Sequence, residues 1–138
     1  MLMNMKNLLE VANKNHFAVP AFNVSDYSMF KGLMEVTEDL NAPVIIAIHP
    51  DELKHVGQSM LSAVIERIHK STVPAVIHLD HGASYEQVIW AIQSGYTSVM
   101  IDASSLPFSK NIQLCRKVVQ TAPSTDTLTA CAVCTTFR

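Results

Sequence analysis

The sequence has few cysteines, no excess of basic residues and no long hydrophobic run. Its three cysteines do not form the even, regularly spaced set of a disulfide framework, so reduced thiols are expected. Ten basic residues stand against twelve acidic ones, and this balance argues against nucleic acid or an anionic membrane as a partner. No segment approaches the roughly 20 apolar residues that span a bilayer, and the N-terminal apolar run is too short for a signal peptide. We therefore expect a cytoplasmic protein.

Glycine is also scarce, with four residues in 138, and no glycine-rich loop follows the first expected strand. Because such a loop is typical of doubly wound nucleotide-binding folds, a flavodoxin-like nucleotide binder is disfavoured. Hydrophobic residues, by contrast, make up 49% of the chain. This content is sufficient for the core of one domain, or for part of a larger one.

Short apolar runs rich in β-branched residues alternate with stretches of helical spacing. This order is typical of repeated βα units around a parallel sheet, and the nearly continuous apolar runs indicate strands that are covered on both faces. Four such units are expected, and an amphipathic helix precedes the first of them. The strands are placed at residues 17–24, 44–48, 75–79 and 97–101, and the last helix at residues 108–121.

Capping residues mark the ends of the expected helices. Ser25 or Asp26 is expected to cap the helix after the first strand. Ser84 and Gln87 form a capping box before the helix of the third unit, and Gly95 supplies the left-handed residue at which that helix ends.

The C-terminal residues differ in character from the rest of the chain. They are rich in threonine and show neither a helical nor a strand pattern, so the chain is divided into residues 1–122 and an unpatterned tail at residues 123–138. The tail contains Cys131 and Cys134 in a CxxC arrangement. A single pair of this kind in an unpatterned segment is interpreted as incidental rather than as a metal or redox site.

Polar residues lie at or just after the carboxyl end of each expected strand, where functional groups collect in parallel α/β folds. They are Asn23, His49, the adjacent Asp80 and His81, and Asp102. The adjacent pair places a proton-transfer group beside a potential metal ligand. An Asp or His at a strand end also commonly caps the next helix, so spacing alone leaves both interpretations open. By contrast, we expect His78, which lies within the third strand, to be buried with a local hydrogen-bond partner.

Several ordered motifs at matching spacing resemble the class II fructose- and tagatose-bisphosphate aldolases. The resemblance covers the chain from about residue 5 to residue 122. The motifs are AVPAFNV at 18–24, APVIIA at 42–47, VIHLDHG at 76–82 and AIQSGYTSVMIDAS at 91–104.

The resemblance implies the first half of a (β/α)8 TIM barrel and a zinc ion that polarises the carbonyl of a phosphorylated ketose. By the motif match, Asp80 is the catalytic acid/base and His81 a zinc ligand. Asp102 matches a carboxylate near the metal that serves an alternate zinc position, and Asn23 matches a substrate-binding residue. Full-length members of the family are expected to form homo-oligomers.

Two positions depart from the family pattern. His49 stands where a small hydroxyl residue or glycine is usual, and Ser105 stands where many members have histidine. For His49, both a solvated loop residue and a new polar contact remain open. The family's further zinc histidines, phosphate loops and loop glutamate have no counterpart after residue 122, although a catalytic zinc needs three protein ligands.

We therefore expect a zinc-dependent aldolase fragment that cleaves a ketose 1,6-bisphosphate, fructose or tagatose, in its parent form and is inactive alone. A frameshift or an early stop would produce such a chain. The alternative is a non-catalytic half-barrel that docks on a full-length aldolase or self-associates. Its motivation is that four βα units leave the first and fourth strands as open edges with apolar side chains uncovered.

Overall fold

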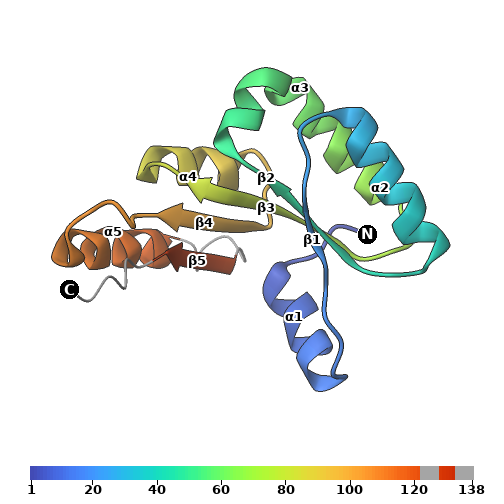
Figure 1. The fold of residues 1–138 in the computed structure, drawn as a ribbon, viewed down its shortest axis with the longest axis horizontal. Coiled ribbons are helices and arrows are strands. Elements are labelled where there is room, and N and C mark those ends of the chain that lie inside the picture. Colours follow the sequence, from blue (N-terminus) through green and yellow to red (C-terminus); the bar gives the residue numbers. More distant parts are fainter. Residues whose placement is uncertain (122–127, 133–138) are drawn as a thin grey trace.

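A computed structural model describes residues 1–121 and 128–132 of the chain (Figure 1). Neighbouring strands pair in parallel in the order β1-β2-β3-β4-β5, which is the α/β arrangement that the sequence predicts. None of the helices in the described ranges is long and apolar enough to cross a membrane. The strands are β1 (Ala21–Asn23), β2 (Val44–Ile48), β3 (Ala75–Gly82), β4 (Ser98–Asp102) and β5 (Leu128–Ala132), and the helices are α1 (Met5–Lys14), α2 (Tyr27–Asp39), α3 (Pro50–His69), α4 (Tyr85–Gln93) and α5 (Phe108–Thr121).

The predicted strands differ from the observed ones mainly at the edges of the sheet. β2 has the predicted bounds, whereas β1 has three residues where eight were predicted, because pairing with β2 is confined to Ala21–Asn23. β3 was predicted to end at residue 79 but continues to Gly82, which pairs with Ile101 of β4. Central strands are thus better specified by their apolar pattern than an edge strand, whose extent depends on one neighbour.

The predicted helix caps are confirmed. Asp26 accepts a hydrogen bond from the amide of Met29 at 2.8 Å, and Ser84 accepts one from the amide of Gln87 at 3.2 Å. The side chain of Gln87 accepts from the amide of Ala83 at 2.7 Å, so the capping box closes one residue before the cap itself. Each bond pairs an amide near a helix start that has no partner within its helix.

A fifth strand lies in the segment for which the sequence predicted no element. Residues 128–132 pair in parallel with β4 from Ser98 to Asp102, so among the described residues the edge strands of the sheet are β1 and β5 rather than β1 and β4. Backbone hydrogen bonding to an existing edge does not require alternating side chains, which explains why the threonine-rich pattern gave no strand signal. Cys134 and the rest of the tail lie outside the described residues.

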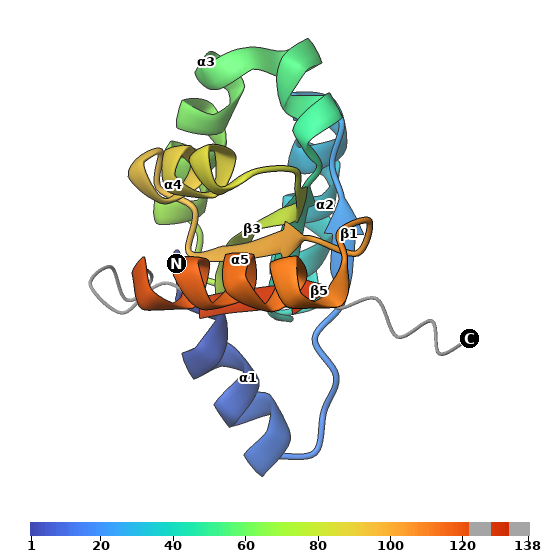
Figure 2. The same cartoon turned by 90° about the vertical axis from the view of Figure 1, so that its left-hand side faces the viewer.

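Side chains of the central strands divide between two hydrophobic clusters. In β2, Ile46 joins the large cluster with residues of α2 to α5, whereas Ile45 joins a smaller cluster with Met5 and Leu8 of α1. Alternate residues of a strand point to opposite faces of the sheet, so α1 covers one face and α2 to α5 cover the other. Figures 1 and 2 show α1 apart from α2 and α3, across the sheet.

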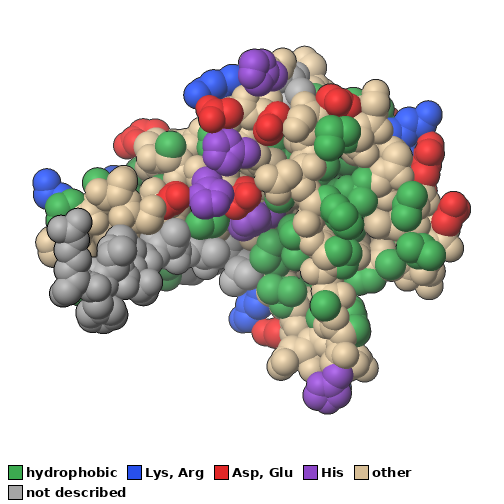
Figure 3. Space-filling view, viewed as in Figure 1, with side chains coloured by type: hydrophobic (Ala, Val, Ile, Leu, Met, Phe, Trp, Pro, Cys, Tyr) green, Lys and Arg blue, Asp and Glu red, His purple; other side chains and the backbone are tan. Residues whose placement is uncertain are grey.

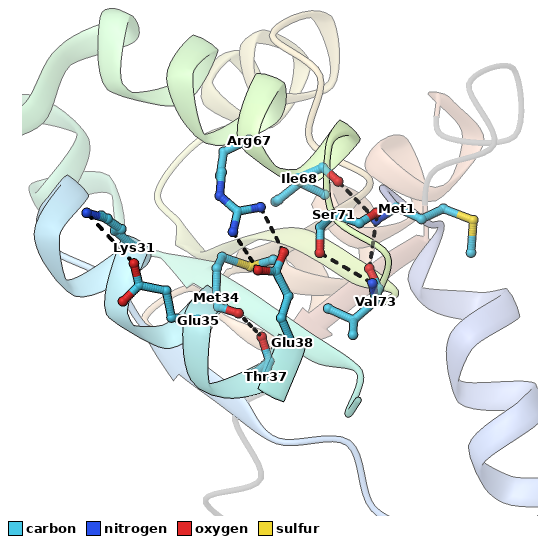
Figure 4. A network of polar contacts seen from close by, with 10 residues as sticks. All are labelled: Met1, Lys31, Met34, Glu35, Thr37, Glu38, Arg67, Ile68, Ser71 and Val73. Atoms are coloured by element: carbon cyan, nitrogen blue, oxygen red, sulfur yellow. Dashed lines mark hydrogen bonds and ion pairs between the residues drawn. The ribbon is translucent and has the colours of Figure 1, made fainter. Parts of the chain in front are cut away.

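An ion pair joins α2 to α3 beside the large cluster. Arg67 donates from both terminal nitrogens to Glu38, at 2.8 and 2.6 Å (Figure 4). The hydrogen bonds from Arg67 are the main reason that the pKa of Glu38 is lowered to about 2. Both side chains are 26% exposed, so water only partly screens this pair.

Candidate functional site

An open pocket of about 580 Å³ lies at the carboxyl ends of the central strands. It brings together groups from the ends of β2, β3 and β4, as expected where parallel strands finish at one edge. Histidine and acidic side chains gather together on this face of the molecule (Figure 3). The residues that line the pocket and enter the chemistry below are His49, Asp51, Lys54, His81, Gln87, Asp102, Ser104 and Ser105.

β3 ends in an irregular segment that presents His81. The pairing register with β4 shifts between Leu79 and Gly82, and His81 has a left-handed backbone with φ of 53°. A Cβ atom on Gly82 would lie 2.6 Å from the carbonyl oxygen of Met100, so only glycine permits this close approach of the two strands. The left-handed conformation of His81 is sparsely populated by residues other than glycine, and such conformations are common at functional sites.

His81 and Asp102 form a short polar contact in the pocket. Nδ1 of His81 lies 2.7 Å from Oδ2 of Asp102, and because a carboxylate only accepts hydrogen bonds, Nδ1 carries the proton. The lone pair of the neutral ring is therefore on Nε2, which lies 3.8 Å from Oδ1 of Asp80. This arrangement, in which a carboxylate fixes the tautomer of an imidazole, is the one that supports metal-ligating histidines.

The electrostatics of the pair follow from these contacts. The pKa of Asp102 is lowered to about 2, chiefly by hydrogen bonds from the hydroxyl and amide of Ser104 and then by His81. The hydrogen bond to Asp102 raises the pKa of His81 above its usual value, and the charge of Asp80 acts in the same direction. Asp102 is thus an anion at neutral pH that favours a proton on Nδ1 of His81.

Both oxygens of Asp102 have hydrogen-bond partners within the chain. Oδ1 accepts from the amide of Ser104 at 3.0 Å, and Oδ2 accepts from His81. The geometry places Asp102 behind the imidazole, as an orienting group. Its role as a metal ligand stays a prediction.

His78, inside β3, differs from His81 in its surroundings. Its Nδ1 lies 2.8 Å from the hydroxyl of Ser98, and burial lowers its pKa. A partly buried histidine with a local partner is what the sequence predicts at this position.

The remaining predicted residues divide between the pocket and its surroundings. His49 lines the pocket, with its ring centre 6.0 Å from that of His81, and Ser105 lines it as well. Asn23 ends β1 in an exposed position and is not among the residues that line the pocket. Its substrate contact stays a prediction.

The sequence did not identify five polar residues that line the pocket as site residues: Asp51, Lys54, Ser84, Gln87 and Ser104. Gln87 was assigned only a capping role, and Ser104 lies two residues after Asp102, a spacing at which an amide commonly bonds an Asp side chain. Lys54 lies one helical turn beyond the start of α3, where its bond to Asp51 is local. Of these, only the Asp-x-Ser spacing carried a signal that the sequence could have provided.

The described residues include one imidazole nitrogen whose surroundings suit a metal ion. Nε2 of His81 is suitable as one ligand, but within residues 1–121 and 128–132 no group of three His, Cys, Asp or Glu side chains is arranged to hold a metal ion. Because a catalytic zinc requires three protein ligands and an open position, these residues alone do not complete such a centre.

Comparison with known proteins places the chain among the aldolases. The family model described as class-II fructose-bisphosphate aldolase matches residues 3–129. A fructose-bisphosphate aldolase of Thermus caldophilus is 34% identical over 122 residues, covering 88% of this chain and 40% of the relative. A probable fructose-bisphosphate aldolase of Bacillus subtilis is 36% identical over 126 residues, covering 88% of this chain and 44% of the relative.

The solved structures agree with the sequence relatives. The YdjI aldolase of Escherichia coli K12 matches with a TM-score of 0.90 and 28% identity, over 96% of this chain and 51% of that one. The predicted fold, the first half of a (β/α)8 barrel, is confirmed. The chain spans less than half the length of the two curated relatives named above. Its matched motifs, its parallel sheet and the family model together show that it belongs to the class II fructose-bisphosphate aldolases.

Proposed function

We propose that this chain carries one half of the active site of a zinc-dependent ketose-bisphosphate aldolase. The reaction is the reversible aldol cleavage of fructose or tagatose 1,6-bisphosphate to dihydroxyacetone phosphate and glyceraldehyde 3-phosphate in the cytoplasm. The observation that carries the proposal is the contact of His81 with Asp102, which leaves Nε2 of His81 free on the side of Asp80.

Each residue of this half-site has a distinct role in the proposal. His81 offers Nε2 as one metal ligand, and Asp102 holds the ring in the tautomer that makes this possible. Asp80 accepts a proton from the substrate hydroxyl on cleavage and returns it in the reverse direction. A bound zinc ion would supply the Lewis acidity that polarises the substrate carbonyl. Asn23 contributes a substrate contact from the neighbouring strand end.

We also propose that the chain has no turnover by itself, because one imidazole does not hold a catalytic zinc. A coupled aldolase assay with added zinc and fructose 1,6-bisphosphate tests this, with the wild type compared with Asp80→Ala. We expect no turnover above background in either protein. Turnover in the wild type that Asp80→Ala removes would contradict inactivity while supporting the role of Asp80.

The exposed edge of the sheet favours a second candidate function. β1 is exposed along its length, with Phe22 46% exposed, and Figure 3 shows a band of hydrophobic side chains on this face. A half-barrel that docks on a full-length aldolase, or on a second copy, would cover such a surface. Light scattering distinguishes the two: a defined dimer or a stable complex supports docking, and a monomer with a cooperative melt contradicts it.

A further inference from the structure

His49 enters the pocket with one ring nitrogen already engaged. It is the N-cap of α3, and its Nδ1 lies 3.1 Å from the amide nitrogen of Asp51. A backbone amide only donates, so Nδ1 of His49 is the acceptor and the neutral ring carries its proton on Nε2. The carboxylate of Asp51 lies 3.7 Å from the same Nδ1, which is beyond hydrogen-bond distance.

The two imidazoles of the pocket therefore have opposite tautomers. His81 donates from Nδ1 to Asp102 and offers a lone pair on Nε2, whereas His49 accepts at Nδ1 and offers an N–H on Nε2. Their ring centres are 6.0 Å apart. Within the described parts of the chain no protein group accepts a hydrogen bond from Nε2 of His49. One ring is suited to a metal ion and the other to an oxygen acceptor.

We propose that His49 is a specificity-determining residue that donates a hydrogen bond from Nε2 to an oxygen of the phosphorylated sugar, and that it is not a metal ligand. This rests on the proposed function, because it places the substrate in the pocket of His81. Metal ligation through Nε2 would move the proton to Nδ1, where it would oppose the amide of Asp51 and break the cap of α3. The imidazole also fills space that a glycine or a small hydroxyl residue would leave open.

The capping bond makes it possible to separate stability from binding. His49→Ser keeps an oxygen that caps the helix but removes the Nε2–H donor, whereas His49→Ala removes both. Asn4 is a matched control, because it caps α1 through the same spacing, accepting from the amide of Lys6 at 2.7 Å, and is not among the pocket residues. Asn4→Ala thus removes a cap without touching the site.

The test is the dissociation constant for fructose 1,6-bisphosphate, measured by NMR titration of each variant of this 138-residue chain. The thermal unfolding midpoint of each variant is measured as well. We expect His49→Ser to weaken binding by roughly tenfold with little change in the midpoint, as for a hydrogen bond to a charged or polar acceptor. Asn4→Ala should lower the midpoint and leave binding unchanged. Wild-type affinity in His49→Ser overturns this inference, and so does absence of binding by the wild type, whereas the proposed inactive half-site is tested separately by the coupled aldolase assay.

A second readout does not depend on any ligand. The side-chain ¹⁵N resonances report the tautomer of each histidine, and at about pH 8.5 neutral imidazoles dominate. We expect the Nε2–H form for His49 and the Nδ1–H form for His81, and an Nδ1–H form for His49 overturns the inference. Parallel titrations with inorganic phosphate and with unphosphorylated fructose identify the acceptor: the ligand whose affinity falls in His49→Ser carries the oxygen that His49 contacts. If neither ligand shows a loss while fructose 1,6-bisphosphate does, the contact requires the whole phosphorylated sugar, as proposed.

Discussion

Nδ1 of His81 lies 2.7 Å from Oδ2 of Asp102, a contact that joins the ends of β3 and β4 across the candidate site. The carboxylate raises the pKa of the imidazole because it stabilises the protonated ring. Replacement of Asp102 by Ala should therefore lower the pKa of His81. An NMR pH titration of the two proteins measures this shift, and an unchanged pKa would show that the contact does not exist in solution.

The ion pair between α2 and α3 should make stability depend on acid. The pKa of Glu38 is about 2 in the fold against an ordinary value of 4.5, so its contribution is present above about pH 4.5 and is lost as the pH falls towards 2. Glu38→Gln should cost about 1–2 kcal/mol at neutral pH, as a partly buried bidentate pair. Urea unfolding across this pH range measures the difference, which should vanish at the acid end.

A neighbouring pair in Figure 4 is the control for this prediction. Lys31 and Glu35 lie 3.7 Å apart on α2 and are both more than half exposed. Glu35→Gln should cost only ~0.3 kcal/mol, the usual value for an exposed pair one helical turn apart. Equal losses in Glu35→Gln and Glu38→Gln would indicate that burial and bidentate geometry add nothing here.

Gly82 should tolerate no side chain, because a Cβ atom would lie 2.6 Å from the carbonyl oxygen of Met100. Gly82→Ala should lose about 1–3 kcal/mol of unfolding free energy, the usual range for overpacking. Gly32, inside α2 with open space around its Cα, is the matched control, and Gly32→Ala should gain about 0.5–1 kcal/mol. Chemical denaturation measures both. An unchanged unfolding free energy in Gly82→Ala would mean that β3 and β4 move apart at this point without a loss of stability.

The hydroxyl of Tyr96 is buried and has no hydrogen-bond partner among the described residues, and burial raises its pKa. Tyr96→Phe should therefore raise the unfolding free energy by about 1 kcal/mol, because the desolvation penalty disappears. Tyr85→Phe is the contrast, since the hydroxyl of Tyr85 bonds to Thr121 at 3.0 Å and its loss should not stabilise. Thermal unfolding of the two variants separates these outcomes.

Local signals in the sequence were sufficient for much of the fold. The apolar run of β2 and the caps at Asp26 and Ser84 depend on residues within a few positions of each other, and each appears in the structure as predicted. β5 was missed because its stability comes from pairing with β4, some 30 residues away in the chain. The strand pattern of a segment is only informative where side-chain burial decides its position.

In the candidate site too, local features were predictable from the sequence, whereas long-range contacts were not. The positions of His81 and Asp102 at strand ends were predictable, but their contact spans 21 residues and depends on the irregular end of β3. The left-handed backbone of His81 has no local signal, because glycine rather than histidine is the usual residue there. Motif resemblance predicted the family, which the comparisons confirm, whereas the tautomers of His49 and His81 required the geometry.

The most direct test of the half-site is the affinity for zinc, measured by calorimetric titration of the wild type, His81→Gln and the remote control His69→Gln. One imidazole supported by a carboxylate should bind zinc only in the micromolar range or more weakly, far from the affinity of a complete site. We expect His81→Gln to abolish this binding and His69→Gln to retain it. Nanomolar affinity, or binding that persists in His81→Gln, would contradict the proposal that His81 is a metal ligand of an incomplete aldolase centre.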